Sequence, residues 1–248
     1  MQNKRLEMKK TKGSIMLLFA AFFWGTTFVA QTTASDQIGT FTFNGSSIVG
    51  AAFLALLILA RTGMKKQKAK VSGEPVEKES IKRTVIGGIL CGCVLFFATN
   101  LQQSGIAAYP EGVASSGRSG FLTATYVVMV AIVSGLLGKK LHKIVYVAVF
   151  VCLGGMYMLC MSGGIDNLYF GDLLGLLCAV CFTGHILTVD HFNDCDSVKI
   201  SCIQFITNGV LSLICMAIFE QPAWSDLAAA WFPILYAGIF SSGIAYTL

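Results

Sequence analysis

Residues 86–101 read IGGILCGCVLFFATNL, sixteen consecutive positions without a charged side chain. Apolar residues on both sides extend this run over residues 84–105. At 1.5 Å per residue, a helix of about 20 residues crosses a hydrocarbon core of about 30 Å. The run therefore predicts a membrane-spanning helix rather than a strand or a buried helix of a soluble domain.

Seven further apolar runs of similar length lie before and after it. They predict an all-α integral membrane protein with eight transmembrane helices, whose ends hydropathy places only to within a few residues. The first run is too long for a signal peptide and lacks a small-residue cleavage site, so we expect a retained helix. The eight predicted spans are 13–33, 39–60, 84–105, 113–137, 144–162, 171–189, 197–218 and 228–248.

The composition agrees with a membrane protein. Hydrophobic residues make up 55% of the 248 residues and charged residues only 12%, so a soluble fold would have too little polar surface to cover its apolar side chains. The net charge of +5 does not indicate a nucleic-acid partner, because the cations lie in short clusters between apolar runs. The expected surroundings are the lipid bilayer.

The distribution of Lys and Arg predicts the orientation. Of the 18 cations, 17 lie in the N-terminal tail and in alternate loops, and the intervening loops contain none. Because Lys and Arg are retained on the cytoplasmic side, we expect a multi-pass protein of the plasma membrane with a cytoplasmic N-terminus. Residues 62–82 are densely charged and are expected to form a flexible cytoplasmic linker; binding to anionic lipid is the alternative.

No metal or other cofactor is expected. Eight of the nine cysteines lie in predicted spans, and the pair Cys178 and Cys181 has no second pair to complete a zinc site. The sequence also contains no nucleotide-binding loop.

The two halves of the chain resemble one another. The segment from Gly13 resembles the segment from Gly171, and the segment ending at Leu101 resembles the one ending at Leu248. The second copy begins five spans after the first, and an odd number of spans reverses the topology of the second copy.

In this order and spacing, several segments resemble the EamA-type carriers of the drug/metabolite transporter superfamily. The resemblance implies ten helices in two inverted five-helix repeats: a first repeat at 13–162 and an incomplete second repeat of three helices at 171–248. We therefore expect a chain truncated after its eighth helix. The matching segments are AAFFWGTTFV (20–29), SGFLTATYVV (119–128), GKK (138–140), GDLLGLL (171–177) and GIFSSGIAYTL (238–248).

Arg118 is the one cation predicted to lie within a span. Intramembrane polar residues are functional-site hypotheses, because they need a partner or water. With Asn100 and Gln103 at a similar depth, Arg118 forms a candidate site for a substrate carboxylate. The alternatives are snorkelling towards the outer surface or an ion pair with Glu111.

Polar and aromatic side chains follow one face of several other spans at helical spacing. They predict a polar interior, although each residue alone is as well explained by helix packing. His185 is the weaker candidate for proton coupling. The other predicted substrate-binding residues are Trp24, Tyr126, Gln204, Asn208 and Tyr246.

The sequence thus predicts a secondary transporter that moves small polar or anionic metabolites, such as amino acids, by alternating access. An intramembrane enzyme is less favoured, because the predicted spans offer one His and no interior acid. A non-transporting helical scaffold is the third possibility. Two GxxxG motifs, at 88–92 and 171–175, permit a homodimer but are better explained by packing within the bundle.

Overall fold

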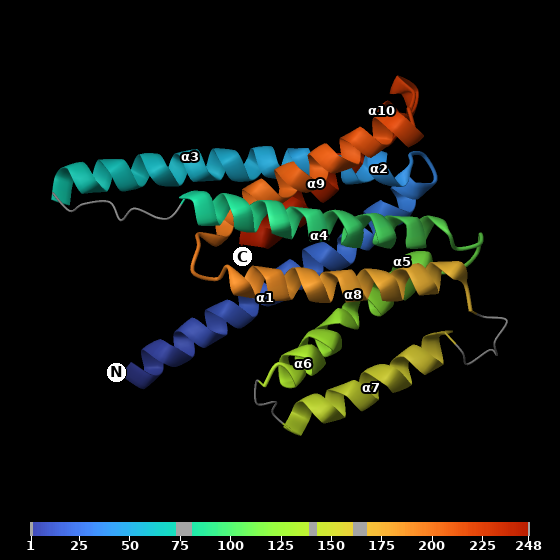
Figure 1. Cartoon of the computed structure of the whole chain (residues 1–248), viewed down its shortest axis with the longest axis horizontal. Helices are drawn as coiled ribbons and strands as arrows, with labels where there is room; N and C mark the ends of the chain where they lie inside the picture. The colour runs from blue at the N-terminus through green and yellow to red at the C-terminus, as the bar shows by residue number, and fades with distance from the viewer. Residues whose placement is uncertain (1, 73–80, 139–142, 161–167, 248) are drawn as a thin grey trace.

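The computed structural model describes residues 2–72, 81–138, 143–160 and 168–247. Over these ranges every regular element is a helix (Figure 1). The elements are α1 (Gln2–Ser35), α2 (Thr40–Asn44), α3 (Ser47–Ser72), α4 (Ile81–Ala107), α5 (Ser115–Ala124), α6 (Tyr126–Leu136), α7 (Lys143–Cys160), α8 (Phe170–His191), α9 (Ser197–Phe219), α10 (Trp224–Ala229), α11 (Trp231–Tyr236), the π-helix η2 (Ala237–Ile244) and the 3₁₀-helix η3 (Ala245–Thr247).

Six segments of the described chain are long and apolar enough to cross a membrane. They correspond to six of the eight predicted spans; the fifth prediction corresponds to a shorter apolar helix, Lys143–Leu159, and the eighth is divided among four short elements. The six segments are Thr11–Ser35, Thr40–Met64, Ile81–Ala107, Ser115–Leu136, Phe170–His191 and Ser197–Phe219.

The eighth predicted span is interrupted for a local reason. Pro233 has no N–H, and its ring opposes a helical carbonyl four residues earlier, at Ala229. The chain accordingly ends α10 at Ala229 and begins α11 two residues later. Pro233 then falls in the first turn of α11, where no intrahelical donor is needed.

Two other predicted spans are interrupted, one near its start and one near its middle. The second is divided into α2 and α3 at Gly45 and Ser46. The fourth is divided into α5 and α6 at Thr125, whose hydroxyl donates to the carbonyl of Leu122 at 2.6 Å. Such back-bonding competes with the regular helical pattern.

Part of the predicted flexible linker is helical. Residues 62–72 continue α3, so the expectation of a flexible segment is wrong for them. This stretch contains Lys, Gln, Ala and Met, which are good helix formers despite their charge or polarity. Residues 73–80 of the predicted linker, residues 139–142 of the predicted cytoplasmic loop and residues 161–162 of the fifth span lie outside the described residues.

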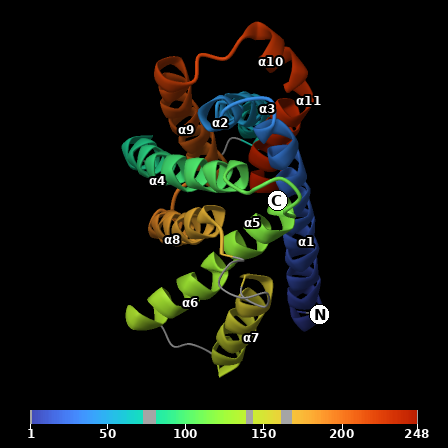
Figure 2. The same cartoon turned by 90° about the vertical axis from the view of Figure 1, so that its right-hand side faces the viewer.

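Helix α4 lies between α8 and α9 and packs on both (Figures 1 and 2). Glycines permit this close approach. A Cβ atom at Gly92 would lie 2.7 Å from the carbonyl oxygen of Gln204 in α9, and one at Gly105 would lie 3.2 Å from that of Gly171 in α8. Gly88 and Gly171 also face neighbouring helices of the same chain. Both GxxxG motifs are thus used within the bundle.

The remaining elements complete an enclosure around one side of α4. Helix α1 forms the side of this enclosure that faces α4, and it contacts α5, α11 and η2 (Figure 2). Helix α3 packs on α9 and η2. Helix α7 contacts α5 and α6, which places it at the edge of the bundle. Small and aliphatic side chains, including Ala51, Leu54 and Leu95, form the main buried cluster between α3, α4 and α9.

Candidate substrate cavity

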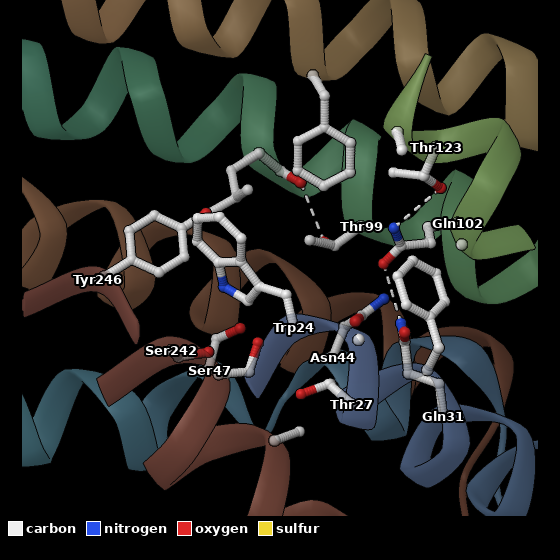
Figure 3. A pocket seen from close by; sticks show the side chains of 18 of the residues that line it. Trp24, Thr27, Gln31, Asn44, Ser47, Thr99, Gln102, Thr123, Ser242 and Tyr246 are labelled. Carbon is white, nitrogen blue, oxygen red and sulfur yellow. Dashed lines mark hydrogen bonds between the residues drawn. The ribbon is translucent and has the colours of Figure 1, made fainter. Parts of the chain in front are cut away.

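A cavity of about 650 Å³ lies at the centre of this enclosure (Figure 3). Its wall combines residues from α1 to α6, α8, α9, η2 and η3. The volume lies within the usual range for small-molecule sites. Two of the helix interruptions described above border the cavity, at Ser46 and at Ala124 beside Thr125, and Ala237 lines it where α11 gives way to η2.

One part of the wall is aromatic. Trp24 of α1 meets Tyr246 of η3 edge to face with ring centroids 5.5 Å apart, and Tyr246 meets Phe205 of α9 in the same way at 4.7 Å. Across the cavity, the rings of Tyr126 and Phe182 lie 5.9 Å apart. Together they present ring faces and edges to an apolar or cationic group.

Another part of the wall is built from amides and hydroxyls (Figure 3). Gln31 Nε2 donates to Gln102 Oε1 at 3.0 Å, and Gln102 Nε2 donates to Thr123 Oγ1 at 3.2 Å. We call these three side chains, from α1, α4 and α5, the amide relay. Asn44 of α2 lies beside it and donates to Asn100 Oδ1 at 3.0 Å. In the described chain, Gln31 Oε1 and Asn44 Oδ1 accept no hydrogen bond and remain available to a ligand.

Asn208 of α9 is part of the wall and is held by its neighbours. It is fully buried, and its Nδ2 donates to Ser47 Oγ at the start of α3 at 2.9 Å. Thr99 of α4 and Ser212 of α9 donate to its oxygen at 3.4 and 3.5 Å. This network fixes the break between α2 and α3 against the bundle.

His185 of α8 also borders the cavity. Its side chain is 2% exposed, and its Nε2 lies 2.9 Å from Gln204 Oε1 of α9. The other ring nitrogen, Nδ1, is buried and has no hydrogen-bond partner.

The structure brings five of the nine predicted site residues to the cavity and leaves four behind it. Asn100 donates to the carbonyl of Phe96 in its own helix and accepts from Asn44 of α2, and Gln103 donates to the carbonyl of Gln31 in α1. Gln204 contacts His185 but does not line the cavity. Arg118 does not line it either, and its surroundings are described below. The five residues at the cavity are Trp24, Tyr126, His185, Asn208 and Tyr246.

Several lining residues were not among the predicted binding residues. Gln102 is the clearest, since it lies between Asn100 and Gln103 in the sequence, and only the helical phase of α4 decides which amide faces the cavity. Thr27 and Gln31 share the helical face of Trp24 on α1, a signal that the sequence did contain. Ser46 and Ser47 reach the wall because α3 begins there.

Arg118 forms an ion pair with Asp172, which lies in the first turn of α8. Its guanidinium forms a two-pronged contact with Asp172, Nε to Oδ1 at 2.5 Å and Nη2 to Oδ2 at 2.6 Å, and Nη1 donates to the carbonyl of Leu159 at 3.2 Å. The hydroxyl of Tyr109 donates to Asp172 Oδ1, and the ring of Tyr169 lies 4.9 Å from the guanidinium carbon. We call this set the Arg118 cage.

The cage contradicts the two alternatives that the sequence left open for Arg118, snorkelling and an ion pair with Glu111. Arg118 is 8% exposed and pairs with Asp172 rather than snorkelling or pairing with Glu111, which is exposed. Asp172 is 4% exposed and also caps α8 by accepting from the backbone N–H of Tyr169. The two charges balance each other, and neither lines the cavity.

Arg118 and Asp172 thus neutralise each other and leave no charge for the cavity wall. The described residues that line it include no Lys, Arg, Asp or Glu. The part of the chain that the structure describes contains no group of three His, Cys, Asp or Glu side chains placed to hold a metal ion.

Comparison with known proteins relates the chain to membrane transporters. The chain matches the EamA-like transporter family over residues 11–161, more than half of its length. It is similar to an uncharacterized transporter of Archaeoglobus fulgidus, with 25% identity over 187 residues, which make up 75% of this chain and 51% of that protein. The chain thus spans about half the length of this relative.

A solved structure, described only as the crystal structure of a protein, shows the same fold. Its TM-score is 0.66 with 20% identity, over 95% of this chain and 77% of that chain. At this identity the likeness concerns the fold alone. The family match, the transporter relative and six apolar helices of membrane-spanning length together identify a multi-pass membrane protein that belongs to the EamA-like transporter family.

Proposed function

We propose that the chain forms the substrate-holding part of a secondary carrier for small amphipathic metabolites, with apolar amino acids as the favoured class. The observation that carries this proposal is the two-sided cavity, aromatic around Trp24 and Tyr246 and amide-lined at Gln31 and Gln102. An amino acid such as leucine or phenylalanine has a matching apolar body and polar head. Membership of a transporter family supports a non-enzymatic role.

The cavity lining favours neutral or zwitterionic ligands over the anionic ligands that the sequence also suggested. The candidate anchor for an anion, Arg118, is engaged by Asp172. The groups that face the cavity are amides, hydroxyls, rings and one imidazole, which hydrogen-bond without carrying a formal charge. A free anion would lose its hydration there without gaining a counter-charge.

Alternating access is supported by the pattern of helix packing. In an inverted repeat α1, α3 and η2 would be the counterparts of α8, α9 and α4. Helix α4 packs on α8 and α9, and η2 packs on α1 and α3. Both contacts use glycine: a Cβ atom at Gly238 of η2 would lie 2.9 Å from the carbonyl oxygen of Ser46. Such matching halves, with interrupted helices at the site between them, are the arrangement that rocks in many carriers.

We further propose that the protein lies in the plasma membrane with a cytoplasmic N-terminus, as the cation distribution predicts. Further helices would complete the second repeat if it matches the first. A homodimer is not required by this arrangement, because the GxxxG glycines are used within the bundle.

Binding tests the proposal without requiring a complete transport cycle. The chain has three tryptophans, of which Trp24 lines the cavity while Trp224 and Trp231 are exposed. In a Trp224→Phe, Trp231→Phe variant, the fluorescence of Trp24 should change saturably with L-leucine. It should remain unchanged with L-glutamate, whose side chain adds a negative charge.

Uptake into proteoliposomes is the second measurement, made with radiolabelled leucine on this chain and on a form extended to ten helices. Saturable uptake abolished by Gln102→Leu supports the carrier. If no amino acid in a full panel alters Trp24 fluorescence, the proposed substrate class is wrong. Binding without uptake by either form favours the scaffold alternative.

A further inference from the structure

Three buried polar side-chain atoms in the described chain have no hydrogen-bond partner: Gln103 Oε1, Ser119 Oγ and His185 Nδ1. Buried polar atoms are nearly always paired, so each exception needs an explanation. Only His185 among the three residues borders the cavity. Of the three residues, His185 is therefore the one that a ligand in the cavity can contact.

The hydrogen bond at the other end of the ring determines what Nδ1 can do. Nε2 lies 2.9 Å from Gln204 Oε1, and an amide oxygen only accepts. Nε2 must then carry the ring proton and donate. A neutral imidazole has one N–H, so Nδ1 is left with a bare lone pair and is an acceptor.

The surroundings of the ring favour a cationic donor. Phe182 meets His185 edge to face at 6.4 Å between centroids, and Tyr126 lies beside Phe182. All three residues line the cavity. Aromatic faces attract ammonium groups, and an ammonium group has three N–H donors and no acceptor.

We infer that His185 Nδ1 accepts a hydrogen bond from the ammonium group of the bound ligand, so that this cavity selects ligands with a primary amine. The inference rests on the proposed function and deepens it, since it assigns the polar head of the ligand to α8. The amide relay is then left to hold the remaining polar atoms of the ligand.

Two substitutions separate the nitrogens of His185. A glutamine side chain places its amide near the Nε2 position, so His185→Gln keeps the contact with Gln204 and removes the acceptor at Nδ1. An asparagine places its amide near Nδ1, so His185→Asn keeps an acceptor there and loses the contact with Gln204. Ser119→Ala is the matched control, because Ser119 Oγ is buried and unpartnered but away from the cavity.

The probes are L-leucine and its N,N,N-trimethyl betaine, which carries the same charges but has no N–H donor. For each protein, Trp24 fluorescence gives the Kd of the betaine divided by the Kd of leucine. Comparing this ratio between proteins cancels the effect of the added methyl groups. The ratio should be about tenfold greater in the wild type than in His185→Gln. It should be unchanged in Ser119→Ala and partly retained in His185→Asn. Equal ratios in the wild type and His185→Gln would overturn the inference.

A measurement on the wild type makes the result independent of how well a variant folds. The chain has three histidines, so ¹⁵N-histidine labelling with His142→Gln and His191→Gln for assignment gives the protonation state of His185. We expect a protonated Nε2 and a bare Nδ1 that shifts on addition of leucine. A protonated Nδ1 with leucine still bound contradicts this assignment alone. A bare Nδ1 with no amino acid bound contradicts the proposed function as well.

Discussion

Several partners together stabilise the buried guanidinium group of Arg118. The carboxylate of Asp172 takes two prongs of the guanidinium, the carbonyl of Leu159 accepts from a third nitrogen, and the ring of Tyr169 lies against its face. These partners come from α7, α8 and the turn before α8. The cage therefore joins α7, at the edge of the bundle, to α5 and α8.

We predict that Arg118→Met destabilises the protein by about 3–5 kcal/mol, because it leaves the Asp172 carboxylate buried without a counter-charge. Arg118→Lys should be intermediate, since an ammonium group cannot reproduce the planar fork. The double variant Arg118→Met, Asp172→Leu should recover most of the loss. Thermal unfolding in detergent, followed for all three variants, measures these differences.

Ligand binding by the folded fraction distinguishes a structural cage from a substrate anchor. A structural cage predicts leucine affinity close to that of the wild type in the double variant. Loss of binding in a double variant of full thermal stability would instead restore the sequence-based hypothesis that Arg118 anchors the substrate.

Sequence analysis identified the classes of site residue better than their orientation. Trp24 and Tyr246 were predicted and line the cavity, whereas Asn100 and Gln103 were predicted and do not line it, and Gln102, which was not predicted, does. Successive residues of one helix differ by about 100° in direction, so an error in helical phase exchanges a lining residue for a buried neighbour. Asp172 was not counted as an interior acid because it lies at the end of a predicted span, yet it is buried, caps α8 and pairs with Arg118.

At the scale of elements, the close contacts of α4 depend on the absence of side chains. A Cβ atom at Gly92 would lie 2.5 Å from Thr207 Cβ and 2.7 Å from the backbone oxygen of Gln204. Backbone atoms cannot rotate away, so the two helices would have to separate. Since α9 also carries Phe205 and Asn208, any separation would disturb the wall of the cavity.

Gly92→Ala should therefore destabilise the protein by about 1–3 kcal/mol, as overpacking usually does. Gly154→Ala on α7 is the matched control, because a Cβ atom there meets no other atom within 4 Å. It should be neutral or slightly stabilising, since alanine favours the helix. Thermal unfolding of both variants checks the pair, and equal destabilisation would show that the α4–α9 contact is not tight.

The positions of the apolar helices followed from hydropathy, but their interruptions did not. Runs such as 84–105 contain enough apolar residues to locate a span without tertiary information. The breaks at Gly45, Thr125 and Ala230 arise from single residues in otherwise apolar runs, and a window of about 20 residues averages such signals away. The helical continuation of α3 to Ser72 was missed for the opposite reason, because charge was given more weight than helix propensity.

An exposed ion pair holds the loop between α8 and α9 against the start of α4. Arg83 Nε donates to Asp194 Oδ2 at 2.8 Å, and Nη2 donates to Oδ1 at 3.0 Å. This hydrogen bonding lowers the pKa of Asp194 below its ordinary value. Because the folded-state pKa is depressed, the stabilisation is present above the unfolded pKa of about 4 and is lost as the pH falls through the folded pKa.

Asp194→Asn should accordingly lower the unfolding temperature slightly at pH 7, and the difference from the wild type should disappear as the pH falls below about 4. Asp36→Asn serves as the control, because the exposed Asp36 forms no ion pair in the part of the chain described here. Unfolding temperatures measured across this pH range test the prediction. A constant difference between wild type and Asp194→Asn at all pH values would contradict it.

At the scale of the whole molecule, the cation distribution and the helix order predict which ends of the bundle share a side of the membrane. The two ends of α9 are marked by the exposed residues Asn193 and Ser225. Since α9 is 23 residues long, these positions should lie on opposite sides. The side of Asn193 should be cytoplasmic, together with the N-terminus.

Reporter fusions after residue 193 and after residue 225 test this topology. A cytoplasmic reporter should be active only at the first position, and a reporter that requires export only at the second. The N-terminus provides the internal reference. Activity of the same reporter at both positions would mean that α9 does not span the membrane.

The amide relay has a direction. Gln31 donates to Gln102, and Gln102 donates to Thr123. An amide has one donating and one accepting end, so the direction reverses only when both glutamine side chains rotate together and the threonine hydroxyl turns. In the direction seen here the oxygen of Gln31 is left free, and in the reversed direction its nitrogen would be. The same wall can thus offer a ligand either an acceptor or a donor with no movement of the backbone, and the chemistry of the ligand selects the polarity of the whole relay.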